Sequence, residues 1–138
     1  MSDPASANPR PQIRNIGLSI ILFSYRLPPA GRVSILHRVS GALLFLALPL
    51  IVSIFAMSIV SEAGFLAIST ITGFLPVKLI FLILVWAYLH HFCAGIRYLT
   101  LDLHMGLDKA SAQKSAGVVF GVSLALTLVF ALKLFGAW

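Results

Sequence analysis

An apolar run of about 22 residues, at positions 39–60, constrains this chain more than any other feature because it contains no ionisable side chain. A helix of that length crosses a hydrocarbon core of roughly 30 Å. A second apolar stretch covers 76–100, with Lys78 at one end and Arg97 near the other. A third covers 116–138 and is interrupted by a single lysine. The sequence therefore predicts three membrane-spanning helices.

The composition agrees with this interpretation, since 59% of the 138 residues are hydrophobic and only 10% are charged. Three spans leave no room for a separate soluble domain in a chain of this length. We therefore expect one all-α integral membrane domain over 1–138, with spans at about 35–60, 76–103 and 114–137. The one cysteine, Cys93, lies inside the second span and is interpreted as a small apolar filler.

The N-terminal stretch is not expected to be a targeting signal. Residues 1–12 are rich in Pro, Ser and Ala, with neither the apolar core of a secretory signal nor the repeated arginines of a transit peptide. Residues 13–25 are too short to span and are expected to form a short interfacial segment at the cytoplasmic face. A bacterial inner membrane is the simplest location.

Basic residues predict the orientation of the chain. Five arginines precede the first long apolar run, against a single acidic residue. They are Arg10, Arg14, Arg26, Arg32 and Arg38. The segment 61–75 has no Lys or Arg, whereas 97–114 has three basic residues. Because cytoplasmic segments are enriched in Lys and Arg, we expect a cytoplasmic N-terminus and a periplasmic C-terminus at Trp138.

The net charge of +6 does not indicate nucleic-acid binding. The arginines flank spans, and no binding platform of alternating aromatic and basic residues accompanies them. Membrane topology and contact with anionic lipid explain the charge, so we expect membrane lipid but no nucleic acid as a partner.

Two adjacent histidines, His90 and His91, lie inside the second span, where an imidazole in hydrocarbon is costly. Neighbouring side chains on a helix point about 100° apart, so the two rings cannot serve one site equally. His91 shares a face with Gly95, which lacks the side chain that would collide with a flat macrocycle. This spacing favours His91 as a haem ligand, whereas His90 is more simply a hydrogen-bonding partner of a neighbouring helix.

A haem b in this position would need cations for its propionates, and His37, Arg38 and Arg97 can supply them. It would also need a second axial ligand for low-spin electron transfer. Met57 is at the far end of its span, and His104 lies beyond the second span. The second ligand is therefore expected from another subunit.

Two motifs support this interpretation. Residues 34–41 read SILHRVSG and fit the pattern S-x-x-H-R-x-[ST]-G. Residues 91–97 read HFCAGIR and, with Asp102, fit H-x3-G-x-R followed by D. With three spans, the chain resembles the cytochrome b large anchor subunits of succinate dehydrogenase, the membrane part of respiratory Complex II. The resemblance covers most of the chain.

The resemblance implies that His91 is an axial ligand of haem b and that the small anchor subunit supplies the other. It also implies a ubiquinone site at Ser34 and Arg38, with His37 and Arg38 close to a propionate. Ser34 and Arg38 are four residues apart and share a helix face. Taken alone, Ser34 is more simply a helix cap and Arg38 a cation reaching lipid phosphate, and it is the combined motif that favours the quinone site. Ile35 fits either an apolar wall for the quinone or an ordinary lipid contact.

No catalytic residue is expected in this chain, because it has neither a flavin-binding glycine motif nor a cysteine cluster. The resemblance implies that partner flavoprotein and iron–sulfur subunits carry these cofactors and oxidise succinate. Tyr98 stands where the family often has histidine, so that histidine's role is not transferred. Asp102 is left outside the site. Alternatives are a fumarate reductase-type anchor and a haem-free structural or transport subunit. The second would be indicated by an acidic or cationic group at the centre of a span, and the sequence has none there.

Overall fold

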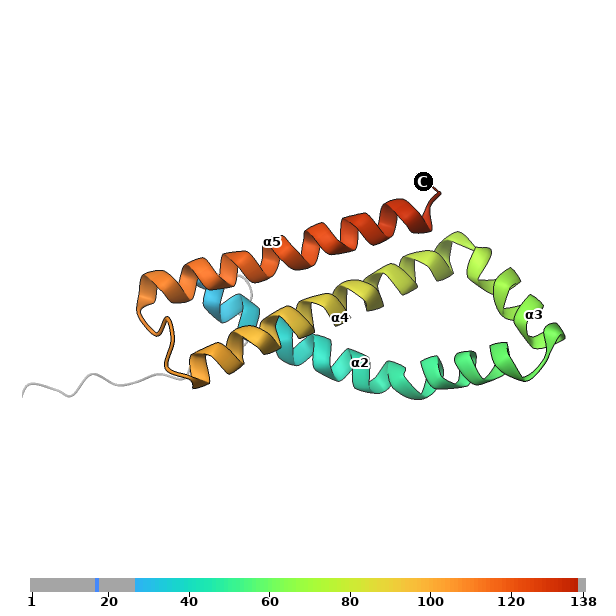
Figure 1. The fold of residues 1–138 in the computed structure, drawn as a ribbon, viewed down its shortest axis with the longest axis horizontal. Coiled ribbons are helices and arrows are strands. Elements are labelled where there is room, and N and C mark those ends of the chain that lie inside the picture. Colours follow the sequence, from blue (N-terminus) through green and yellow to red (C-terminus); the bar gives the residue numbers. More distant parts are fainter. Residues whose placement is uncertain (1–16, 18–26, 137–138) are drawn as a thin grey trace, which may run out of the picture.

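A computed structural model describes Gly17 and residues 27–136, and its regular elements are four helices. Three of them are long and apolar enough to cross a membrane: α2 (Pro29–Val60), α4 (Leu75–Asp102) and α5 (Lys109–Leu134). They run lengthwise through the molecule, and the short helix α3 (Glu62–Gly73) lies across one end (Figure 1). The predicted all-α membrane fold with three spans is confirmed. The expected interfacial segment at 13–25 lies outside the described residues apart from Gly17.

Helix α2 begins at Pro29, six residues before the start of the predicted span. Proline suits a first helical position, because the amide hydrogen that it lacks would have no partner there. The N-cap residue is Pro28, so Ser34 lies more than one turn inside the helix. The interpretation of Ser34 as a helix cap is therefore wrong, and its hydroxyl is available for another role.

The three predicted spans do not include helix α3, because its 12 residues are too few to cross a membrane. Its start does carry a local signal: the Ser61 hydroxyl accepts a hydrogen bond from the Gly64 amide at 3.0 Å. A side chain at Gly64 would clash with the Met57 carbonyl, so glycine permits the sharp corner between α2 and α3. Figure 1 shows α3 bridging the ends of α2 and α4 where these helices diverge.

Small residues hold the three long helices together. The buried core contains Val33 from α2, Ala94 from α4, and Ala116 and Val119 from α5. Such residues let helix backbones approach closely where lipid provides no hydrophobic driving force. In contrast, the most apolar stretch of α2 has no buried residue within this chain. That surface is left for lipid or for a helix of another subunit.

A tight loop reverses the chain between α4 and α5. His104 and Gly106 adopt left-handed backbone conformations, with φ values of 60° and 68°. Asp108 then caps α5, because its Oδ2 accepts a hydrogen bond from the Ser111 amide at 2.9 Å. Hydrogen bonds from Ser111 hold the pKa of the Asp108 carboxyl below its usual value.

We expect Asp108→Ala to speed hydrogen exchange at the first amides of α5, because this variant loses the cap. Asp108→Asn should keep most of the protection, because asparagine caps a helix equally well. The lowered pKa means that the carboxylate stabilises the helix at neutral pH, and that this contribution is lost as pH falls through that pKa. The Asn variant should lack this pH dependence. Exchange measured by mass spectrometry tests both points, and equal rates in wild type and Asp108→Ala would contradict the role of the cap.

Candidate functional site

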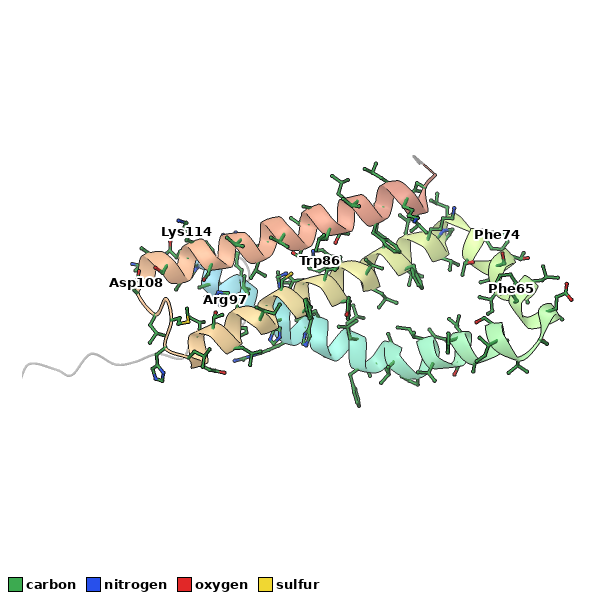
Figure 2. The ribbon with its side chains drawn as sticks, in the orientation of Figure 1. Phe65, Phe74, Trp86, Arg97, Asp108 and Lys114 are labelled. Carbon is green, nitrogen blue, oxygen red and sulfur yellow. The ribbon has the colours of Figure 1, made fainter. Side chains whose placement is uncertain are left out.

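Helix α4 presents its functional side chains on two different faces. One face meets α2: the rings of His91 and His37 stack with centroids 4.2 Å apart, and the Tyr98 ring lies 5.1 Å from that of His37. The other face meets α5, where His90 contacts Phe120. Figure 2 shows Trp86 and Arg97 between α4 and α5. The adjacent histidines therefore belong to different environments, as the helical periodicity predicts.

The His91 ring is held by the backbone of α2. Its Nδ1 lies 3.0 Å from the carbonyl oxygen of His37 and 3.4 Å from the Ser40 hydroxyl. A carbonyl oxygen only accepts, so this hydrogen bond requires a proton on Nδ1 and, in the neutral ring, leaves the lone pair on Nε2. Nε2 makes no hydrogen bond within the part of the chain that the structure describes. The arrangement is one in which Nε2 can bind a metal.

Gly41 makes this contact possible. A Cβ added at Gly41 would lie only 2.8 Å from Cε1 of His91, so any side chain there would displace the ring. At Gly95, an added Cβ would meet only Nε2 of His37, at 3.9 Å. Gly95 therefore leaves room beside the paired histidine rings, whereas Gly41 sets how closely α2 and α4 approach.

Sequence reasoning quoted Ser40 and Gly41 within the first motif but gave them no role. The Ser40 hydroxyl donates to the His37 carbonyl at 3.0 Å, and that carbonyl also binds His91. The only signal in the sequence was their place beside His37 in the motif. Their effect on a histidine some 50 residues away depends on how two helices pack, which no local pattern reveals.

His90 is completely buried among the three long helices. Its ring packs near Trp86 and Phe120, with centroid separations of 5.3 and 5.4 Å. The Val33 backbone approaches the ring, but neither ring nitrogen reaches hydrogen-bonding geometry with a described residue. The contacts of His90 are therefore mainly aromatic, and its position in the core hides it from any group outside the chain.

Arg97 points toward α5 and is only 6% exposed. Its Nε donates to the Ser115 hydroxyl at 3.0 Å, and its Nη2 donates to the Ala112 carbonyl at 3.1 Å. It is six positions from His91, which places the two side chains on different faces of α4. The structure does not bring Arg97 together with His91, although the sequence grouped them around one haem.

The other predicted site residues lie on the first turns of α2. Ser34 is half-buried, Arg38 is exposed, and Ile35 is 44% exposed. Neither Ser34 nor Arg38 forms a hydrogen bond with another described residue. Their polar groups, one helical turn apart, are thus available to a ligand near His37.

These features define a helical membrane protein with three spans and a histidine whose Nε2 makes no hydrogen bond with a described residue. The family model for the transmembrane subunit of succinate dehydrogenase/fumarate reductase matches residues 8–130, so the chain belongs to this family. It is 32% identical to the succinate dehydrogenase cytochrome b556 subunit of Coxiella burnetii over 124 residues, which cover 88% of this chain and 94% of that protein. The corresponding subunit of Paracoccus denitrificans is 30% identical over 115 residues, covering 83% of this chain and 88% of that protein.

We expect Gly41→Ala to destabilise the α2–α4 contact by about 1–3 kcal/mol, the usual cost of overpacking. Gly117→Ala is the matched control, because an added Cβ there meets nothing within 4 Å. At Gly117 the helix propensity of alanine should instead stabilise the protein by up to about 1 kcal/mol. The thermal unfolding midpoints of the purified complex should shift in opposite directions. Equal shifts would mean that the close approach at Gly41 is unimportant.

Proposed function

We propose that this chain is the cytochrome b membrane anchor of a succinate dehydrogenase complex and that it helps to pass electrons from succinate to ubiquinone. The observation that carries this proposal is the hydrogen bond between Nδ1 of His91 and the His37 carbonyl, which leaves Nε2 for a metal. Family membership and the cytochrome b relatives support the proposal.

The residues present fit haem b. No group of three or more His, Cys, Asp or Glu side chains gathers to hold a bare ion among the described residues. A single ligand such as His91 suits iron that is already held in a macrocycle, and Gly95 leaves space on the same face of α4. When bound, haem b would supply a one-electron carrier, and His91 would hold it together with a residue of the small anchor subunit.

His37 and Arg38 are the residues of this chain proposed to bind the haem propionates. His37 already lies against His91, and Arg38 is exposed beside it on α2. Propionate binding by Arg97 is not supported, because its hydrogen bonds go to α5.

Ser34 and Arg38 are proposed to bind ubiquinone. Quinone reduction consumes two electrons and two protons, and negative charge develops on the carbonyl oxygens as electrons arrive. The Ser34 hydroxyl can donate a hydrogen bond to one carbonyl, and the Arg38 guanidinium can stabilise the developing charge. Ile35, partly exposed next to Ser34, is proposed to contact the apolar part of the quinone ring.

In the proposed complex, flavoprotein and iron–sulfur subunits oxidise succinate and deliver electrons to the membrane face that carries Ser34 and Arg38. The exposed apolar stretch of α2 suits packing against the small anchor subunit. We place the complex in a bacterial inner membrane with the N-terminus in the cytoplasm, on the basis of the arginines that precede the first span. A fumarate reductase-type anchor is the second candidate, because the matched family includes both enzymes.

Difference spectra, reduced minus oxidised, of the purified membrane complex test the haem site. The wild type should show a b-type haem signal that His91→Ala abolishes or alters. His90→Leu, which fills the apolar surroundings of His90, should retain it. A wild-type complex without haem would overturn the cytochrome assignment, and loss of the signal only in the His90 variant would transfer the ligand role to His90.

The quinone site predicts a selective defect in Ser34→Ala. Losing one hydrogen bond, worth about 0.5–1.5 kcal/mol, should lower kcat/KM for a soluble ubiquinone about 2–10-fold. Succinate oxidation with an artificial electron acceptor should not change, because it occurs on other subunits. Ser58→Ala is the matched control, since the Ser58 hydroxyl bonds the Phe55 carbonyl near the other end of α2. Equal quinone kinetics in the two variants would argue against Ser34 as a ligand.

A further inference from the structure

A groove lies between α4 and α5, near the loop that joins them, with a volume of about 310 Å³. We call it the α4–α5 groove; its lining is mainly apolar but includes Arg97, Thr100 and Ser115. These polar residues are near the end of α4 and the start of α5, and therefore near one membrane boundary. Cys93 and Val122 line its other end, closer to the middle of the spans. The groove is thus polar toward the boundary and apolar toward the membrane centre.

Arg97 brings a positive charge into this groove without an anionic partner. Both of its hydrogen bonds go to neutral oxygens, on Ser115 and Ala112. No carboxylate pairs with it among the residues that the structure describes. A guanidinium has five N–H donors, so two bonds leave three of them without an acceptor among the described residues. The guanidinium carbon also lies 5.5 Å from the centroid of the Tyr98 ring, but the ring and the two neutral oxygens carry no net negative charge, and a nearby anion would lower the cost of holding this nearly buried cation at the edge of a membrane.

The position of the groove indicates which kind of anion would bind. The haem and quinone residues proposed above lie on α2 or on the α4 face that meets α2, whereas Arg97 faces α5. The rim of the groove includes Ile96 and Val118, which are 48% and 57% exposed on the outer surface of the bundle. A molecule entering from the surrounding lipid can therefore reach the groove without passing through the α2–α4 contact.

We propose that the α4–α5 groove is a binding site for an anionic phospholipid, with the phosphate at Arg97 and an acyl chain along Ile96, Val118 and Val122. Phosphate oxygens accept the remaining guanidinium N–H groups, and an anionic headgroup supplies the missing negative charge. A zwitterionic headgroup carries its own cation and neutralises Arg97 less well. The polarity of the groove runs in the same direction as that of a phospholipid in the bilayer. This inference requires only that the chain spans a membrane, and it does not depend on haem or quinone binding.

The test compares lipid binding in the intact membrane complex, purified in detergent, for the wild type and three variants. Arg97→Gln removes the charge. Val118→Phe fills the groove at an exposed position and leaves the Arg97 hydrogen bonds in place. Leu128→Phe is the control, because Leu128 is 60% exposed on the same helix and does not line the groove. Native mass spectrometry measures retained lipid, and thermal unfolding is followed after delipidation with added phosphatidylglycerol or phosphatidylcholine.

The wild type and Leu128→Phe should retain one phosphatidylglycerol per copy of this chain and be stabilised more by phosphatidylglycerol than by phosphatidylcholine. Val118→Phe and Arg97→Gln should lose both properties. Val118→Phe should keep the haem spectrum of the wild type, which separates this result from a failure of the proposed function. If the complex that carries Arg97→Gln does not assemble, the lipid binding of Val118→Phe alone tests the proposal. Equal responses to the two lipids, wild-type behaviour of Val118→Phe, or recovery of quinone in place of phospholipid would each overturn the proposal.

Discussion

The contact between His91 and the backbone of α2 is the interaction on which the site depends. It joins the two motifs of the chain, because the His37 carbonyl holds Nδ1 of a ring that comes from another helix. The same contact sets the spacing of α2 and α4, since Gly41 leaves no room for a side chain between them. A metal ligand must be held in a fixed orientation to be effective, and the packing of α2 against α4 fixes the orientation of the proposed ligand, His91.

The membrane explains why polar groups are distributed so unevenly. Most of the surface of the three long helices is apolar, and the polar side chains of the two proposed sites lie toward the end of the bundle where α4 joins α5. There they divide into two groups, one between α2 and α4 and one between α4 and α5. The first is the proposed cofactor site, where Nε2 of His91 and the polar groups of Ser34 and Arg38 make no hydrogen bond with a described residue. The second contains the nearly buried Arg97 beside the α4–α5 groove, so the two proposed sites lie on different faces of α4.

The two adjacent histidines show what helical periodicity predicts from sequence. The spacing of His91 and Gly95 selected the ring that faces α2, and the structure places His90 in the core beside Phe120. The same helical periodicity also separates Arg97 from His91, but proximity in the sequence had grouped them. The sequence did not predict helix α3, because its 12 residues are too few for a membrane span.

The sequence alone determined the three spans, their approximate limits and the motif residues, because hydrophobic length and helical periodicity are local properties. The spacing to Gly95 also favoured His91 over the adjacent His90 as the proposed haem ligand. Only the tertiary structure decided which groups hold that histidine, which way Arg97 points and where a groove opens. Those features depend on the distance and register between helices that are far apart in the chain. Small residues at the helix contacts, such as Gly41 and Ala94, set that distance and register.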